Sequence, residues 1–213
     1  MARLSIPSEV DVDIQGDLTV RGTISPAISR ATLQEDSDQP YVVPLTSAKV
    51  WDAVQTNLPG TAATDDLELN SGAVWGTDVP SVQTGDLKAA GATSRYALFE
   101  VSMPPEYIAT GSAALRFSAG MITTVADTSC NLDVTAYLGD REAGADGADL
   151  CITAAQSMNS LTYADLDFSL TSTSLNAGDT VFIRVEIACT DAATGTAVIG
   201  AIGGIQLLLD IKG

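Results

Sequence analysis

The chain has 213 residues and a formal net charge of −17, from 27 acidic and 10 basic side chains. A chain this acidic repels phosphate backbones and anionic lipid surfaces, which argues against nucleic-acid binding and membrane binding. It contains no histidine, so the usual general base, the Ser–His and Cys–His nucleophile pairs and the commonest metal ligand are all missing. Composition therefore disfavours most enzyme classes, and the length suits one large all-β domain or a smaller domain with an appendage.

The first sixty residues predict an extended attachment arm rather than a core. Short apolar rows alternate with acidic residues and are separated by glycines, which is typical of β segments too few to enclose a core. Unpaired strand edges are unfavourable, so we expect these segments to become ordered by pairing with other chains. The apolar residues of this predicted attachment arm are Val10, Val12, Ile14, Leu18 and Val20.

A short helix is predicted from about residue 47 to residue 57. Thr46 or Ser47 can cap its start, and Pro59–Gly60 can end it. A short lone helix is marginal in water unless its apolar stripe packs on something. Three copies of the stripe can close around an axis, although the sequence leaves a dimer or a pentamer open. The predicted oligomer interface consists of Val50, Trp51, Val54 and Leu58.

From about residue 94 onward, apolar and polar residues alternate with a period of two, as in strands that bury one face. Turn formers such as those at residues 176–179 separate the rows. Residues 61–93 are ambiguous, and could form an edge strand or cover the sandwich. We predict an all-β fold with two parts: an N-terminal arm over residues 1–60 with one short helix, and an antiparallel, jelly-roll-like β-sandwich over residues 61–213. The alternating rows are 97–103, 115–117, 132–138, 150–152, 166–170, 181–189 and 205–211.

The cysteines and the chain ends bear on the compartment. Cys130, Cys151 and Cys189 have no CxxC spacing and lie in or beside apolar runs, where a cysteine is most often a small buried side chain. We expect them to be reduced, in a chain that folds in a reducing cytoplasm. The N-terminus lacks the continuous apolar stretch of a secretory signal, and the apolar segment 197–209 is too short for a spanning helix.

The acidic loop of residues 139–149 is a candidate for a metal site. Calcium prefers several oxygen ligands on a flexible loop. The spacing does not match an EF-hand, and Arg141 offsets part of the charge, so a solvated loop is the alternative interpretation. No other cofactor is expected. The calcium candidates are Asp140, Glu142, Asp146 and Asp149.

No motif in the sequence predicts catalysis. A GxSxG elbow, a P-loop and a GxGxxG fingerprint are absent. A carboxylate pair could still act as acid and base, but each candidate acid fits equally well on a solvated sheet face. The eleven aromatic residues form no recognisable stacking platform; Trp51 is expected to be a packing anchor and Trp75 to cap the core. We therefore expect no enzymatic activity. The candidate acids are Glu100, Glu106, Asp133 and Asp167.

Three segments resemble structural proteins of phage virions. The segment GDLTVRGTI (residues 16–24) is similar to short repeats at the base of phage fibres and spikes, where three chains wind together. The segment YVVPLTSAKVWDAVQTNL (residues 41–58) is similar to trimerising segments that precede a β-domain. The segment SLNAGDTVFIRVEI (residues 174–187) resembles a hairpin of virion jelly-roll domains. Together they cover about half of the chain.

The resemblance implies a bacteriophage capsid decoration or head-fibre protein without catalytic residues. Such a protein would be assembled in the host cytoplasm and reside in the virion as a homo-oligomer, expected to be a homotrimer. Its arm would bind the major capsid protein or another virion protein, and its sandwich would be displayed outward. The alternative is a receptor- or glycan-binding tail-fibre tip that contacts a host-surface glycan through the end loops of the sandwich. A carbohydrate-active enzyme is a third interpretation.

Overall fold

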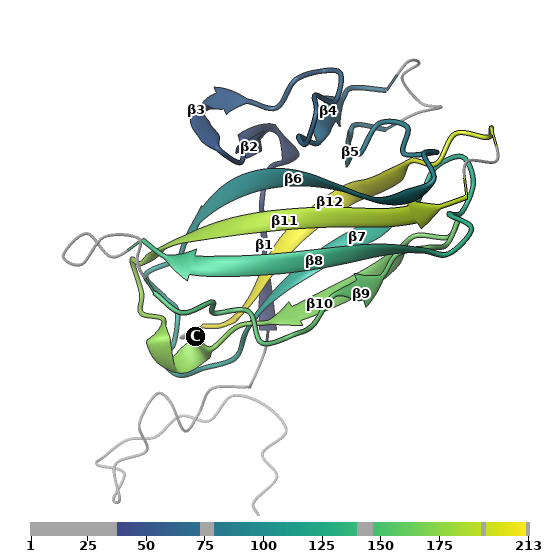
Figure 1. Cartoon of the computed structure of the whole chain (residues 1–213). Helices are drawn as coiled ribbons and strands as arrows, with labels where there is room; N and C mark the ends of the chain where they lie inside the picture. Colours follow the sequence, from purple (N-terminus) through teal and green to yellow (C-terminus); the bar gives the residue numbers. More distant parts are fainter. Residues whose placement is uncertain (1–37, 73–78, 140–146, 193–194, 212–213) are drawn as a thin grey trace, which may run out of the picture. The chain divides into compact units, whose positions relative to one another are not determined.

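The computed structural model of the chain describes residues 38–72, 79–139, 147–192 and 195–211. In these residues, two antiparallel sheets of six strands each face one another across a hydrophobic core (Figure 1). Sheet A has the order β10-β7-β12-β5-β4, with β1 also paired to β12, and sheet B has the order β3-β2-β6-β11-β8-β9. The predicted all-β, antiparallel sandwich is confirmed. The described part of the chain contains no helix long and apolar enough to cross a membrane.

The strands and the two single 3₁₀ turns have the following bounds. Sheet A comprises β1 (Asp38–Val42), β4 (Glu68–Asn70), β5 (Ser81–Gln83), β7 (Ala113–Met121), β10 (Ala164–Ser169) and β12 (Gly200–Asp210). Sheet B comprises β2 (Lys49–Val50), β3 (Ala53–Asn57), β6 (Gly91–Ser102), β8 (Ser129–Leu138), β9 (Gln156–Ser157) and β11 (Thr180–Asp191). The 3₁₀ turns are η2 (Leu45–Ser47) and η3 (Ser172–Ser174).

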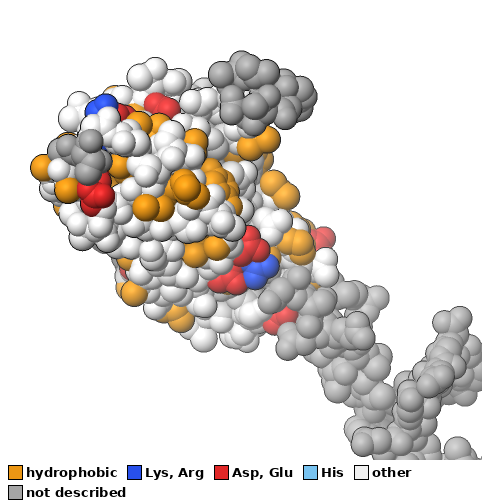
Figure 2. All heavy atoms as spheres, turned by 90° about the vertical axis from the view of Figure 1, so that its right-hand side faces the viewer, with side chains coloured by type: hydrophobic (Ala, Val, Ile, Leu, Met, Phe, Trp, Pro, Cys, Tyr) orange, Lys and Arg blue, Asp and Glu red, His pale blue; other side chains and the backbone are white. Residues whose placement is uncertain are grey.

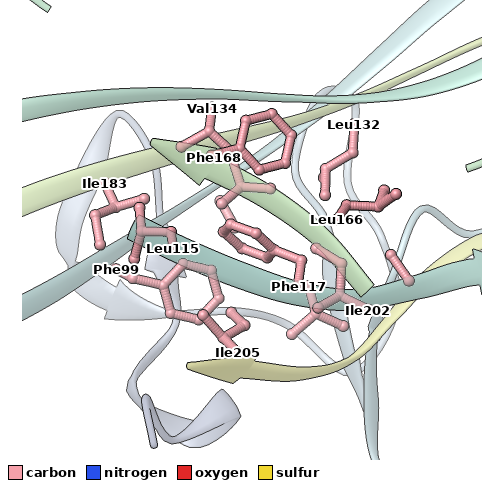
Figure 3. Packing of buried hydrophobic residues seen from close by; sticks show 14 of the residues in the cluster. Phe99, Leu115, Phe117, Leu132, Val134, Leu166, Phe168, Ile183, Ile202 and Ile205 are labelled. Atoms are coloured by element: carbon pink, nitrogen blue, oxygen red, sulfur yellow. The ribbon is translucent and has the colours of Figure 1, made fainter. Parts of the chain in front are cut away.

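Alternation of apolar residues decides which face of each strand is buried. Along β11 every second side chain is buried, and the strand pairs along most of its length with β6 on one side and β8 on the other. Phe99 of sheet B and the sheet A residues Phe117 and Phe168 meet between the sheets (Figure 3). The rings of Phe117 and Phe168 contact edge to face, with centroids 5.6 Å apart. Each such ring stabilises the fold by roughly 1.5–3 kcal/mol relative to an exposed one.

The predicted helix over residues 47–57 is wrong. After η2 the chain forms the two short strands β2 and β3, and Lys49 pairs with Leu98 of β6. Val50 and Leu58 are buried in the core of the same chain, whereas Val54 is 55% exposed. The free edge of β6 offers backbone hydrogen bonds and a core contact, and these tertiary gains outweigh a weak local helix preference. The helical stripe that predicted the oligomer interface of Val50, Trp51, Val54 and Leu58 therefore does not form.

The division between arm and sandwich lies earlier in the chain than residue 60. Strand β1 pairs with β12 and β2 pairs with β6, so residues 38–60 belong to the sandwich. The chain separates into a unit Met1–Gln34 and a unit Glu35–Gly213. The first unit contains the predicted attachment residues, all of which lie outside the described residues: Val10, Val12, Ile14, Leu18 and Val20. Trp75, in the second unit, also lies outside the described residues.

Two of the three cysteines form a disulfide, which corrects the expectation that they are reduced. Cys130 of β8 lies directly opposite Cys189 of β11, with Cα atoms 4.0 Å apart. Both are fully buried, as expected. Their separation of 59 residues contains no pairing signal, because only the register of two strands brings them together. Cys151 is the free cysteine, and burial raises the pKa of its thiol.

Candidate functional site

The outward side of sheet B carries a row of aromatic and charged side chains on its three central strands. In the strand register, Arg184 of β11 lies between Leu98 of β6 and Thr135 of β8. The neighbouring rows place Phe182 between Glu100 and Tyr137, and Glu186 between Tyr96 and Asp133. Side chains on this side are partly exposed because the alternate residues of the same strands fill the core. We call this surface the sheet B face; it consists of Tyr96, Leu98, Glu100, Asp133, Thr135, Tyr137, Phe182, Arg184 and Glu186, with Trp51 beside them.

Trp51, Tyr96 and Arg184 form a cluster on the sheet B face. Trp51 lies in the turn between β2 and β3, and its ring centroid is 5.3 Å from that of Tyr96. The guanidinium carbon of Arg184 is 6.0 Å from the Trp51 ring and 5.6 Å from the Tyr96 ring. A guanidinium at this distance from an aromatic face contributes about 0.5–1 kcal/mol at a partly exposed site. The cluster therefore combines apolar ring surfaces with one fixed positive charge.

Hydrogen bonds fix the orientation of each member of this cluster. The indole N–H of Trp51 donates to Asp65 Oδ2 at 3.2 Å, and the Tyr96 hydroxyl donates to Glu186 Oε1 at 3.3 Å. Arg184 Nε donates to Thr135 Oγ1 at 3.2 Å. Side chains held by such secondary contacts lose less conformational entropy when a ligand binds.

The position of Asp65 follows from the backbone of its segment. The amide of Tyr96 donates to the Asp65 carbonyl, and the amide of Leu67 donates to the Tyr96 carbonyl, both at 2.8 Å. Leu67 is fully buried and anchors the segment in the core. The segment thus lies along β6 at Tyr96, which brings the Asp65 carboxylate to the Trp51 indole.

Two further aromatic rings extend the sheet B face along the same strands. Phe182 and Tyr137 are register neighbours and are both partly exposed. The Phe182 ring lies against Gly139, where an added Cβ would approach within 2.8 Å. The sheet B face therefore offers four aromatic rings. Sequence reasoning missed this platform, since the four residues are far apart in the chain and only the strand register gathers them.

The structure does not bring the candidate catalytic acids together. Asp133 and Glu100 lie on the sheet B face, whereas Asp167 belongs to sheet A and Glu106 to the turn after β6. Arg116 donates two hydrogen bonds of 2.7 Å to the carboxylate of Asp167. These bonds hold the pKa of Asp167 below its usual value. Asp167 is thus an ion-pair partner rather than a poised acid.

The calcium prediction remains untested. Asp149 Oδ1 accepts hydrogen bonds from the amides of Ala136 (2.8 Å) and Cys151 (2.9 Å), so this oxygen holds the backbone beside β8. The other candidates, Asp140, Glu142 and Asp146, lie outside the described residues. Within the described ranges, no group of three His, Cys, Asp or Glu side chains is arranged to hold a metal ion.

The end loops of the sandwich expose several aliphatic side chains. Ile122 and Val125 follow β7, and Leu161 precedes β10; all three are substantially exposed. Figure 2 shows hydrophobic side chains spread over one end of the molecule, with charged side chains in small groups. The end loops, which the sequence suggested for glycan contact, therefore differ in character from the aromatic sheet B face.

Comparisons with known proteins concern the fold. No protein-family model and no curated protein matches the chain. Among solved structures, the CBM22-1 xylan-binding domain of Xyn10C from Paenibacillus barcinonensis is 12% identical, with a TM-score of 0.44 over 84% of this chain and 100% of that chain. TmCBM61 in complex with beta-1,4-galactotriose is 12% identical, with a TM-score of 0.39 over 62% of this chain and 72% of that chain. The enzymatically active domain of tailspike protein 4 from bacteriophage CBA120 is 12% identical, with a TM-score of 0.37 over 70% of this chain and 18% of that chain.

Proposed function

We propose that this chain is a non-catalytic glycan-binding module and that the sheet B face binds the glycan. The observation that carries the proposal is the cluster of Trp51, Tyr96 and Arg184 on a partly exposed sheet surface. The C–H faces of a pyranose ring are apolar and pack against aromatic rings, while its hydroxyl groups need hydrogen-bond partners at the ring edge. A site with aromatic walls and a few placed polar groups meets both needs.

The charges on this face favour a neutral glycan. This side of sheet B carries the carboxylates of Glu100, Asp133 and Glu186, with Asp65 beside Trp51, and its cations are Arg184 and Lys49, which lies opposite Leu98. Carboxylates accept hydrogen bonds from sugar hydroxyls, but they repel uronic acids and sulfated sugars. The row of rings along three strands suits internal units of an extended chain, because no wall closes an open sheet surface at its ends.

Affinity measurements on the full chain test this proposal. Isothermal titration calorimetry with soluble xylan and beta-1,4-galactotriose, together with a neutral-glycan array, provides the ligands. Trp51→Ala and Tyr96→Ala should each weaken binding by about tenfold or more, equivalent to about 1.4 kcal/mol. Val54→Ala is the matched control, since Val54 is exposed on the same hairpin and lies outside the cluster. No binding to any neutral glycan, or binding that survives both aromatic substitutions, rejects the proposal.

A second candidate function is attachment to a virion as a decoration or fibre protein. Its support is the resemblance of residues 16–24 to phage fibre repeats and the separation of the chain into Met1–Gln34 and Glu35–Gly213. Residues 41–58 no longer support it, because they are part of the sandwich. Quantitative gel densitometry of purified particles tests it: a decoration protein is present in many copies and a fibre tip in few. Absence of the chain from particles excludes both forms. Light scattering on the full chain tests the proposed homotrimer separately.

A further inference from the structure

A cavity lies on sheet A, the sheet opposite the one that carries the sheet B face. It has a volume of about 310 Å³ and opens on the outward side of sheet A, between the end of β1 and strands β7, β10 and β12. We call it the sheet A pocket. Its walls combine apolar side chains with several polar groups: Val42, Leu45, Arg116, Ser118, Asp165 and Gln206, with Gly203 and Gly204 between them.

The pocket exists because β12 carries a bulge and two adjacent glycines. The register of β12 against β7 shifts between Ile202 and Gly204, so Gly203 has no counterpart in the ladder. Glycine inside a central strand weakens it, and marks places where a bulge or another group approaches the backbone closely. At Gly203 that group is the ring of Tyr163, which a Cβ would approach within 3.1 Å. Tyr163 also covers Gly120 and remains 37% exposed.

Gly204 has no such packing reason to be glycine. A Cβ at this position would meet nothing closer than the Ser118 Cβ, at 3.9 Å. Its φ is not among the positive values of the described residues, so backbone conformation does not require glycine either. The missing side chain leaves the middle of the sheet A pocket open.

The polar groups of the pocket suit hydroxyl groups rather than an ion. Arg116 is held by its two hydrogen bonds to Asp167, and Asp165 Oδ2 lies 3.9 Å from Arg116 Nε. One guanidinium therefore faces two carboxylates, an arrangement that does not attract an anion. Gln206 and Ser118 add an amide and a hydroxyl that can both donate and accept. Together with the apolar side chains of Val42 and Leu45, these groups give the pocket both apolar surface and hydroxyl-binding groups.

We propose that the sheet A pocket is a second binding site, for a single neutral sugar unit such as the end of a glycan chain. Its volume is at the lower limit of ordinary small-molecule sites, about 300 to 1,000 Å³, and so fits a short ligand rather than a polymer segment. This site does not depend on the sheet B face, because the two share no residue and lie on different sheets.

NMR titration of the full chain with single sugar units tests the pocket. The probes are methyl α-D-glucopyranoside, methyl β-D-glucopyranoside and methyl β-D-galactopyranoside, each raised to tens of millimolar. At least one should shift the backbone amide signals of Gly203, Gly204 and Gln206 saturably. Gly204→Val should abolish these shifts by filling the pocket, and should leave the thermal unfolding midpoint unchanged or higher, because glycine in a strand is unfavourable. Gly204→Ala is the smaller substitution if valine prevents folding.

Two control variants show whether the shifts arise from a sugar bound in the pocket. Ala114→Val adds bulk to β7 on the same side of sheet A but outside the pocket lining, and should keep the shifts. Trp51→Ala should also keep them, since Trp51 belongs to the sheet B face. The proposal is overturned if no probe causes saturable shifts, if the shifts persist in Gly204→Val, or if Trp51→Ala removes them. Polysaccharide binding through the sheet B face is measured separately, so either proposal can fail alone.

Discussion

The indole of Trp51 contacts the phenol ring of Tyr96 at an interplanar angle of 48°, and the carboxylate of Asp65 accepts its N–H. Tyr96 belongs to β6 and Asp65 to the segment before β4, and both hold the Trp51 side chain in place. Trp51 is therefore oriented before any ligand arrives, which lowers the entropic penalty of binding.

Removing the Asp65 carboxylate should weaken glycan binding less than removing Trp51. A hydrogen bond of this kind contributes about 0.5–1.5 kcal/mol, so Asp65→Ala should lower affinity by roughly two- to tenfold. Asp65→Asn keeps an oxygen acceptor for the indole N–H and should bind nearly as well as the wild-type chain. Calorimetric titration of the wild type, Asp65→Asn, Asp65→Ala and Trp51→Ala with the same glycan measures the order of their affinities. Equal affinity of Asp65→Ala and the wild type would show that the hydrogen bond does not orient the ring.

The ion pair between Arg116 and Asp167 should stabilise the fold only above acidic pH. Hydrogen bonding by Arg116 lowers the pKa of Asp167 below 3.8, so the contribution is present above that value and is lost as pH falls through the lower folded-state pKa. Because the Asp167 side chain is 46% exposed, Asp167→Asn should reduce stability by only about 0.5 kcal/mol at neutral pH. Urea unfolding at a series of pH values from neutral downward measures the difference, which should shrink as the pH falls through the folded-state pKa of Asp167. A destabilisation of equal size at every pH would point to packing instead of charge.

The carboxyl of Asp66 should stabilise the fold in acid and not at neutral pH, the opposite of the ion pair between Arg116 and Asp167. Burial raises the pKa of its carboxyl above 3.8, with Asp65 and Asp52 adding to the shift and Arg95 opposing it. Its buried Oδ1 has no hydrogen-bond partner among the described residues. The folded state then holds the proton more tightly than the unfolded state, so stability falls as pH rises from 3.8 through the folded-state pKa.

Asp66→Asn should therefore raise the thermal midpoint at neutral pH. Below the ordinary pKa of an aspartate the carboxyl is protonated in both states, and the variant and the wild type should melt together. Differential scanning calorimetry at the two pH values distinguishes this result from a general packing effect, which would persist in acid. A variant that melts lower at neutral pH would mean that attraction to Arg95 dominates.

The disulfide should be detectable by counting thiols. Denatured, unreduced protein should show one reactive thiol, that of Cys151, and reduced protein should show three. A cross-link that spans 59 residues restricts the unfolded chain, for a stabilisation of about 4 kcal/mol in the chain-entropy model. Denaturant unfolding with and without reductant should differ by an amount of this order. Three thiols in protein purified without reductant would contradict the cross-link.

The sequence predicts the sheets well where burial alternates regularly. Val181, Ile183, Val185 and Ile187 fall on one face of β11, as their spacing requires. It fails at residues 47–57, where local spacing fits a helix but the edge of β6 supplies better partners. It also missed the disulfide and the aromatic cluster. Trp51, Tyr96 and Arg184 meet only through the register of β6 and β11 and the β2–β3 turn, and register is a property of the whole fold.

Strand β12 holds a position in sheet A that makes the other strands of the sheet depend on it. It pairs with β1, β5 and β7, yet among the described strands it is the last to be synthesised. Sheet A therefore cannot close during synthesis until residues 200–210 have emerged. Strand β1 is synthesised well before β12 and lacks this pairing partner until then. Pairings this distant in sequence slow folding, and leave strand edges exposed to neighbouring nascent chains in the meantime. A truncation that removes β12 would take away the partner of β1 and separate β7 from β5.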